Sequence, residues 1–328
     1  MAKKGPWRRK IERDFIRTVT SVAAGAVAHL SLPAARVLGD MVGDAICLMS
    51  VRRMQLADRN LRLCFGERLT AAERARIRRF CTRNAAKTML ELLKLPRMSA
   101  AEFHRLVSVE NPEVLAAAVD QGRGVMVVTA HYGNWELLAA AISDLGHDLH
   151  VVARDHADRT TAYIINRARE SWGEKVIERA EVRRMIRALR GGGLLVILPD
   201  QHAKTNGVWV DFLGRPASTF TGPARLALQT GALIVPAFGR RTDDDHIICS
   251  FHPPLELPRT GDRDRDVLLG TQVINDALAA EILRHPAQWL WLHNRWRTTT
   301  DEIARQWQHG RPPELRVPPP QPASDVQV

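Results

Sequence analysis

The sequence predicts an α/β fold in which a mostly parallel sheet is covered by helices and preceded by a helical N-terminal region. From Gly122 onward, short apolar runs alternate with segments that have the spacing of amphipathic helices. The apolar runs are continuous, as is typical of strands buried on both faces of a sheet. The expected strands are residues 125–130, 149–154, 194–199, 233–238 and 246–251.

The expected helices account for most of the remaining chain. Residues 36–120 have apolar positions at intervals of three and four, and Thr70 precedes Glu73 at the spacing of a capping box. Between and after the strands, helices are expected at residues 136–146, 159–173, 181–193 and 267–284.

The charge balance favours an anionic partner. In 328 residues, 47 Lys and Arg oppose 36 Asp and Glu, for a net charge of +11. Basic residues crowd positions 3–17, and residues 18–35 that follow contain no charged side chain. This order indicates a membrane-surface anchor or a short span with a cytoplasmic N-terminus, the alternative being an amphipathic core helix behind a solvated basic tail. No zinc-finger, homeodomain or RNA-binding pattern supports nucleic acid as the partner.

We expect three regions along the chain. Residues 1–50 form the basic N-terminus and anchor helix, residues 51–300 the α/β domain, and residues 301–328 a proline-rich, disordered tail. The four cysteines are widely spaced and form no C-x-x-C pair, which indicates reduced thiols in the cytoplasm rather than a disulfide framework or a zinc site.

Ligands of open α/β sheets bind beyond the carboxyl ends of the strands. The residues that directly follow the expected strands therefore form the candidate site. They are His131, Arg154 with Asp155, and Asp200 with Gln201.

A histidine and a carboxylate five positions apart occur three times, at His131/Glu136, His150/Asp155 and His309/Glu314. Only His131 and Glu136 lie on either side of a strand-to-helix turn, where the chain reverses and the two side chains can meet. Gly133 permits that turn, and Asn134 is a suitable N-cap for a helix starting at Trp135.

A carboxylate on one imidazole nitrogen fixes the tautomer, so that the other nitrogen acts as a general base. The alternative for His131 is a structural role at a helix N-terminus. The sequence contains no G-x-S-x-G elbow and no Walker A loop. Direct attack by a substrate hydroxyl on an activated acyl group remains as the natural chemistry.

The stretch TAHYGNWELL, with ILPDQ, VDFLGRPASTFTGPARLALQTGALIVP and HPAQWLWLHNRWR further along, resembles the bacterial lipid A secondary acyltransferases. These are the lauroyl and myristoyl transferases of lipopolysaccharide biosynthesis, which carry an H-x4-D/E motif. The resemblance covers residues 50–298 and implies a glycerol-phosphate-acyltransferase-like fold.

By that resemblance, His131 is the general base and Glu136 its charge-relay partner. The implied substrate-binding residues are Asn134, Arg154, Asp200 and Gln201. Arg154 would contact a phosphate, with a surface ion pair as its alternative, and a structural strand-end role is the alternative for Asp200 and Gln201.

The same resemblance implies the reaction partners. The acyl donor would be a thioester of acyl carrier protein or coenzyme A, used as a co-substrate with no cofactor and no metal. The acceptor would be a lipid A precursor or a related glycolipid such as a phosphatidylinositol mannoside. The enzyme would lie at the cytoplasmic face of the inner membrane, bound peripherally or through one N-terminal anchor.

Two other classes of function fit parts of the sequence. Strand-end residues His131, Asp155, His156, Asp200 and His202 offer ligands for a metal-dependent hydrolase, although no H-E-x-x-H motif is present. The second class is a non-catalytic, basic adaptor protein that binds membranes or RNA. Near the C-terminus, Trp289, Trp291 and Trp296 with Arg295 and Arg297 are candidates for a membrane interface or for packing inside the protein.

Overall fold

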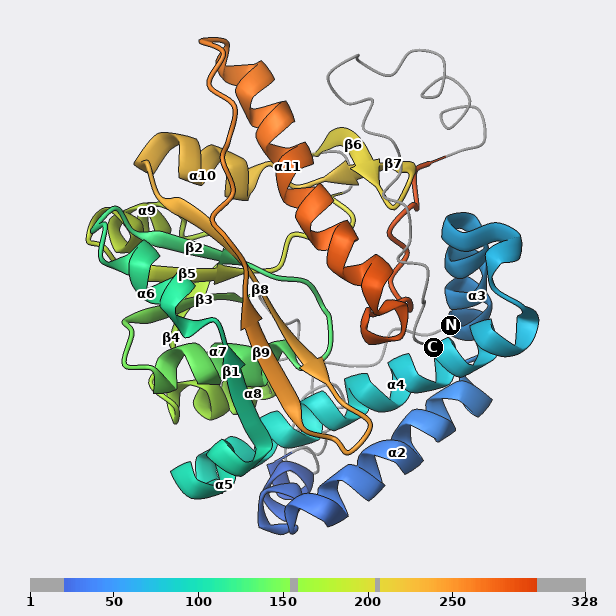
Figure 1. Cartoon of the computed structure of the whole chain (residues 1–328). Helices are drawn as coiled ribbons and strands as arrows, with labels where there is room; N and C mark the ends of the chain where they lie inside the picture. The colour runs from blue at the N-terminus through green and yellow to red at the C-terminus, as the bar shows by residue number, and fades with distance from the viewer. Residues whose placement is uncertain (1–20, 154–158, 204–206, 300–328) are drawn as a thin grey trace, which may run out of the picture.

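The computed structural model describes residues 21–153, 159–203 and 207–299 (Figure 1). The predicted phosphate-binding residue Arg154, the basic stretch at residues 3–17 and the proline-rich tail lie outside the described residues. The division into three regions therefore stays a prediction.

A seven-stranded sheet forms the centre of the molecule, with the order β1-β9-β8-β2-β5-β3-β4 (Figure 1). β1 and β9 are parallel to each other and run antiparallel to the other five strands, so the prediction of a mostly parallel sheet is confirmed. The strands are β1 (Val107–Glu110), β2 (Val125–Val128), β3 (Leu149–Ala153), β4 (Lys175–Glu178), β5 (Leu194–Ile197), β8 (Leu233–Arg241) and β9 (Ile247–Phe251). A separate hairpin pairs β6 (Val208–Phe212) with β7 (Arg215–Thr219).

The helical N-terminal region is also confirmed. Residues 21–29 are helical, and α2, α3 and α4 follow before the sheet begins. The predicted capping box is present at the start of α4, where Thr70 and Glu73 exchange hydrogen bonds. The helices are α2 (Leu32–Met49), α3 (Val51–Phe65), α4 (Ala71–Lys94), α5 (Ala100–Leu106), α6 (Pro112–Val119), α7 (Trp135–Asp144), α8 (Arg159–Glu170), α9 (Val182–Arg190), α10 (Gly222–Thr230) and α11 (Arg263–Arg284).

Two apolar cores sandwich the sheet. Alternate residues of β2 belong to each, since Met126 and Val128 pack in one and Val125 and Val127 in the other. The first core also takes side chains from α9, α10 and α11, and the second from α5, α6 and α7. The continuous apolar strands are thus explained by burial on both faces.

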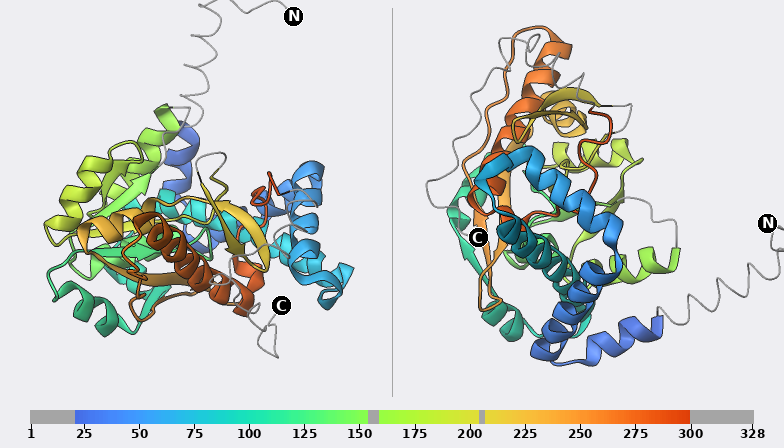
Figure 2. Two further views of the ribbon diagram at one scale, coloured as in Figure 1. Left: turned by 90° about the horizontal axis from the view of Figure 1, so that it is seen from above. Right: turned by 90° about the vertical axis from the view of Figure 1, so that its right-hand side faces the viewer.

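Helix α2 packs tightly along α4 at one side of the molecule (Figures 1 and 2). Gly39 and Gly43 make this possible, because a Cβ at Gly43 would lie 2.4 Å from the Cα of Arg83. The outer face of α2 exposes Val37, Met41 and Leu48, which share one helix face. Among the described residues, no helix is long and apolar enough to cross a bilayer.

The tryptophans near the C-terminus pack inside the protein, so the alternative of a membrane interface is wrong for them. Trp289, Trp291 and Trp296 are at most 2% exposed, and Arg295 is fully buried. The Trp289 indole packs edge-on against Trp291, Trp296 and Phe212, and Trp296 also packs against Phe212 in a tilted arrangement. Burying these large rings against Phe212 of the hairpin stabilises the region beside Asp200, which follows β5 and accepts a hydrogen bond from Trp289.

Candidate active site

The turn between β2 and α7 carries the candidate histidine. Gly133 has a φ of +51°, and a Cβ there would lie 1.9 Å from the carbonyl oxygen of Gly239. Only glycine fits this position. Asn134 caps α7, because its Oδ1 accepts a hydrogen bond of 2.9 Å from the backbone N–H of Leu137. Both sequence predictions for the turn are confirmed.

His131 meets Asp200 rather than its neighbour in the sequence. Strands β2 and β5 are adjacent and parallel, with Val128 in register with Ile197. His131 and Asp200 each follow three residues later, at the same edge of the sheet. Their side chains are joined by a hydrogen bond of 2.8 Å between His131 Nδ1 and Asp200 Oδ1.

The carboxylate of Asp200 is itself fixed in place. Its Oδ2 accepts hydrogen bonds from the backbone N–H of His131 at 3.0 Å and from Trp289 Nε1 at 2.9 Å. The side chain of Asp200 is 2% exposed, whereas that of His131 is 24% exposed. The acid is therefore sealed inside, and the imidazole reaches the surface of the site.

This arrangement determines the tautomer of His131. Because an ionised carboxylate accepts only, the neutral ring must carry its proton on Nδ1 and a lone pair on Nε2. Nε2 lies 3.3 Å from Nε2 of Gln201, whose amide can donate to that lone pair. The ring of Trp135 packs against the imidazole in a T-shaped arrangement, with centroids 5.1 Å apart. A histidine held in this way is suited to accept a proton at Nε2.

The electrostatics of the pair agree with this assignment. Burial by itself disfavours the charged imidazole, but the charge and hydrogen bond of Asp200 outweigh it and raise the pKa of His131 above its ordinary value. Burial also opposes ionisation of Asp200, yet His131 and the Trp289 indole lower the pKa of that carboxyl to about 2. Asp200 is thus ionised at neutral pH.

The expected contact between His131 and Glu136 is a prediction that the structure corrects. Glu136 accepts two hydrogen bonds from the guanidinium of Arg169, at 2.8 and 2.9 Å, and one of 3.0 Å from Trp135 Nε1. Burial disfavours its charge, but Arg169 overrides this effect and lowers the pKa of Glu136. The side chain of Glu136 extends from α7 toward Arg169 of α8. Glu136 therefore acts on the pKa of His131 only through its charge.

A second acid lies beside this ion pair. Glu174 is 2% exposed and its carboxyl oxygens have no hydrogen-bond partner among the described residues. Burial and the nearby Glu136 carboxylate raise its pKa well above the ordinary value, which favours the protonated form. Sequence reasoning identified neither Glu174 nor Arg169, because Arg169 lies inside α8, Glu174 precedes β4, and neither follows the carboxyl end of a strand.

The other predicted site residues have different outcomes. Gln201 lies at the site, beside His131. Asn134 was predicted to bind substrate, but its side chain is fully buried and its Nδ2 donates to Glu91 at 2.7 Å. Its polar atoms are engaged within the protein, and its role in substrate binding stays a prediction. His202 follows Gln201, and its backbone N–H donates to Nε2 of His293 at 3.0 Å.

Among the described residues, no three His, Cys, Asp or Glu side chains gather in a way that would hold a metal ion. Asp155 and His156 of the expected metal set lie outside those residues. All four cysteines, at positions 47, 64, 81 and 249, are free thiols.

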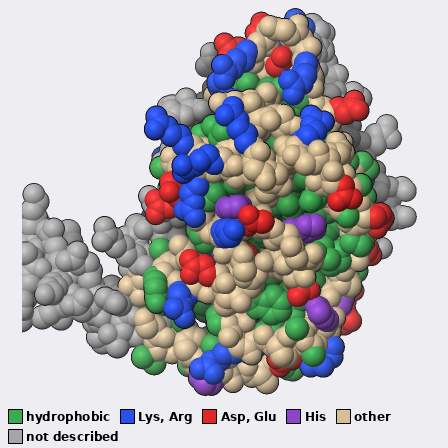
Figure 3. All heavy atoms as spheres, turned by 90° about the vertical axis from the view of Figure 1, so that its left-hand side faces the viewer, with side chains coloured by type: hydrophobic (Ala, Val, Ile, Leu, Met, Phe, Trp, Pro, Cys, Tyr) green, Lys and Arg blue, Asp and Glu red, His purple; other side chains and the backbone are tan. Residues whose placement is uncertain are grey.

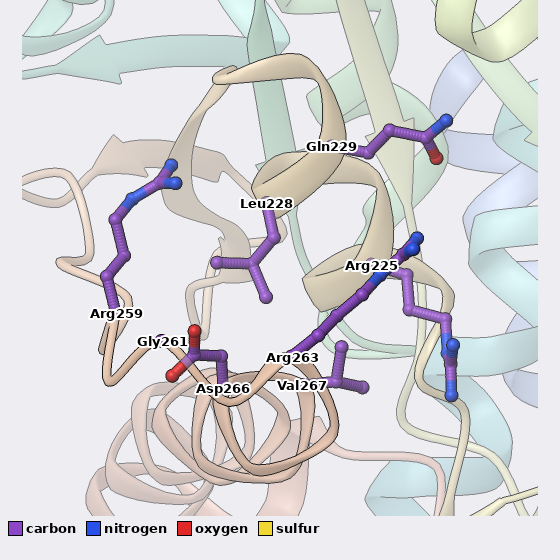
Figure 4. A pocket seen from close by; sticks show the side chains of 8 residues that line it. All are labelled: Arg225, Leu228, Gln229, Arg259, Gly261, Arg263, Asp266 and Val267. Carbon is purple, nitrogen blue, oxygen red and sulfur yellow. The ribbon is translucent and has the colours of Figure 1, made fainter.

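A cavity of about 400 Å³ lies away from this site, between α10 and the start of α11. Figure 4 shows Arg225, Arg259 and Arg263 around it. The opposite end of α11 approaches the candidate site, since Glu281 accepts a hydrogen bond from the hydroxyl of Tyr132. About 27 Å of helix separates Arg263 from Glu281 at 1.5 Å per residue. The cavity is thus remote from His131.

The contact with Asp200 predicts how the pKa of His131 responds to mutation. Asp200→Asn should lower the His131 pKa markedly, because the charge and the charge-assisted hydrogen bond are both lost. Glu136→Gln should lower it less, since Glu136 makes no hydrogen bond to the ring and is neutralised by Arg169. NMR titration of ring C–H signals in histidine-labelled protein, assigned with His131→Gln, measures both shifts. An equal or larger effect of Glu136→Gln would contradict the structural assignment.

Comparison with known proteins agrees with this architecture. The family model described as bacterial lipid A biosynthesis acyltransferase matches residues 2–298. The chain is 27% identical to the phosphatidylinositol mannoside acyltransferase of Mycolicibacterium smegmatis, over 64% of this chain and 69% of that protein. It is 25% identical to the lipid A biosynthesis palmitoleoyltransferase of Escherichia coli over 82% of this chain and 87% of the relative. For the Escherichia coli lipid A biosynthesis lauroyltransferase, the identity is also 25%, over 86% and 91%. The chain is an acyltransferase and belongs to the bacterial lipid A biosynthesis acyltransferase family.

Proposed function

We propose that this protein transfers a fatty acyl group from a thioester to a hydroxyl of a membrane glycolipid, with His131 as the general base. The hydrogen bond of 2.8 Å between His131 Nδ1 and Asp200 carries the proposal, because it leaves Nε2 as the basic atom. Asp200 takes the orienting role that the sequence motif assigned to Glu136. Glu136, paired with Arg169, holds α8 against the turn and contributes a negative charge.

The proposed step needs no acyl-enzyme intermediate. Nε2 of His131 removes the proton of the acceptor hydroxyl while its oxygen attacks the thioester carbonyl, and a C–O bond forms. The tetrahedral intermediate then collapses with cleavage of the C–S bond, and the proton on Nε2 passes to the departing sulfur. Asp200 stabilises the imidazolium that exists between the two proton transfers.

The acyl donor we propose is a thioester of acyl carrier protein or coenzyme A, and the acceptor is a lipid A precursor or a phosphatidylinositol mannoside. The names of the relatives support this range of acceptors. All of these molecules are anionic and suit a chain of net charge +11. Lys and Arg side chains gather over the upper part of the face in Figure 3, and Arg183, Arg187 and Arg190 are exposed along α9.

We also propose that the protein works at the surface of the inner membrane, on its cytoplasmic side. Seven of the ten large apolar side chains that are exposed in the described residues lie between Val22 and Val51. Leu48 and Met49 are 81% and 83% exposed at the end of α2. Exposed apolar residues without a role are usually scattered singly over a protein surface. Their concentration in this segment therefore favours contact with lipid.

The acyl-transfer proposal predicts a large loss of rate when the base is removed. His131→Ala should lower turnover by about two to four orders of magnitude, the usual contribution of a positioned general base. The measurement is mass spectrometry of lipid products after incubation with acyl carrier protein and coenzyme A thioesters, each offered with both glycolipid classes. The Gln201→Ala variant removes the side chain that contacts Nε2 of His131 but leaves the base in place. It therefore separates the loss of a neighbouring contact from the loss of the base. If wild-type protein adds an acyl mass to neither glycolipid, or if His131→Ala retains full turnover, the proposal is wrong.

The membrane proposal predicts that the exposed end of α2 contributes to binding. Leu48→Asp with Met49→Asp should reduce binding to vesicles of anionic phospholipid by at least about tenfold, because two apolar side chains are lost and two negative charges added. Sedimentation with vesicles measures the bound fraction. Leu145→Asp, at a 40% exposed apolar residue after α7, is the control and should bind like the wild type. Equal binding of the double variant would refute the role of α2.

A further inference from the structure

We infer that Arg241 is a positioning residue for acyl transfer, because its guanidinium fixes the turn that carries His131 from two sides. This inference rests on the proposed function, in which His131 is the base. Arg241 lies at the end of β8 and is 3% exposed. A buried guanidinium is costly unless each of its donors is used, which makes its partners informative.

One side of the contact runs through Glu91 of α4. Arg241 donates to both carboxylate oxygens of Glu91, at 2.9 and 2.5 Å, in the parallel geometry of a bidentate pair. The Glu91 carboxylate is fully buried and also accepts from Nδ2 of Asn134 at 2.7 Å. Asn134 is the N-cap of α7, so the ion pair holds the residue at which the turn becomes a helix.

The other side of the contact runs through Asn84, about two turns before Glu91 on α4. Nε of Arg241 donates to Oδ1 of Asn84 at 2.6 Å, which directs the amide nitrogen of Asn84 to the carbonyl of Gly133 at 2.8 Å. The hydroxyl of Thr88 donates to the same carbonyl at 3.2 Å. Gly133 and Asn134 are therefore both held, by two different partners of one guanidinium.

The backbone of Arg241 completes the arrangement. Its N–H and C=O exchange hydrogen bonds of 3.2 and 2.7 Å with the amide of Gln288. The carbonyl of Gln288 accepts from the backbone N–H of Gly133 at 3.0 Å. Two residues later, Leu290 N–H donates to the carbonyl of His131 at 2.9 Å. Strand β8, α4 and the segment after α11 thus meet at the turn. Arg241, the last residue of β8, contacts α4 through its side chain and the segment after α11 through its backbone.

The amino-terminal helix reaches the same carboxylate. Arg36 of α2 donates from Nε to Glu91 at 3.1 Å. Asp245 accepts from Lys87 at 2.9 Å and from Arg241 at 3.3 Å. The positive charges of Arg36, Arg241 and Lys87 are therefore matched by Glu91, Asp245 and Asp40, whose carboxylate lies 3.1 Å from Nζ of Lys87. Balanced charge and many hydrogen bonds are the conditions under which a buried ion pair specifies one conformation.

Lysine cannot replace this arginine. An ammonium group is a compact donor and cannot reach Glu91 and Asn84 together in the planar geometry that a guanidinium provides. Arg241→Lys keeps the charge and the approximate volume but releases Asn84, so Gly133 loses its directed amide. A shift of about 1 Å in a catalytic group costs about a hundredfold in rate.

The test compares Arg241→Lys with Arg83→Lys. Arg83 is also a bidentate arginine, bound to Asp44 at 2.8 and 2.5 Å, but it joins α4 to α2 and not to the turn. Arg241→Lys should lower kcat by about tenfold to a hundredfold, with the KM of donor and acceptor changed less than threefold. Arg83→Lys should leave kcat within about twofold. A purely structural role for Arg241 predicts instead that activity falls only in proportion to the folded fraction measured by thermal unfolding.

A milder variant guards against misfolding. Thr88→Val removes one donor to Gly133 and preserves shape and the ion pair, and it should lower kcat severalfold. The NMR signal of the His131 ring gives a readout that needs no substrate, and Arg241→Lys should shift or broaden it while Arg83→Lys should not. An unchanged ring signal with unchanged kcat in Arg241→Lys would overturn the inference even if wild-type acyl transfer is observed. Absence of acyl transfer by the wild type would count against the proposed function, and the ring signal would still decide the positioning role.

Discussion

The pairing of β2 with β5 is the constraint from which the site follows. Val128 and Ile197 are in register, and the two chains leave the sheet side by side with His131 and Asp200 at equal distances beyond it. A slip of one residue would direct either side chain to the other face. The register is protected because both strands are buried on both faces, so the apolar cores that stabilise the sheet also bring the imidazole and the carboxylate together.

Two buried carboxylates close to His131 serve different purposes because their partners differ. Asp200 is bound by the imidazole, a backbone N–H and an indole, none of which is a permanent cation, so its charge acts fully on the ring. Glu136 shares its charge with the Arg169 guanidinium, which weakens its effect on His131. Glu136 is nearer to His131 in the sequence than Asp200 is, but it has the smaller effect on the pKa of His131.

Much of this fold could be predicted from the sequence, because apolar runs and helical periodicity reflect burial directly. The missed strands β1 and β4 have only four residues each, with polar side chains in the pattern, and lie toward the edges of the sheet. The strand-end rule found His131, Asp200 and Gln201, since that signal is local to each strand. It could not assign the partner of His131, because strand order is not encoded by spacing along the chain. The sequence did not identify Arg169, Glu91 or Arg241 for the same reason, because their roles depend on contacts between segments that are distant in the sequence.

The most direct test of this account is the tautomer of His131. Nitrogen-15 NMR of labelled histidine, at a pH above the pKa of His131 and with the signal assigned by His131→Gln, distinguishes a protonated ring nitrogen from one with a lone pair. Nδ1 of His131 is expected to carry the proton and Nε2 to be free to act as the base, and Asp200→Asn is expected to disturb this preference. A neutral ring protonated at Nε2 in the wild-type protein would contradict the role of Asp200 and the mechanism built on it.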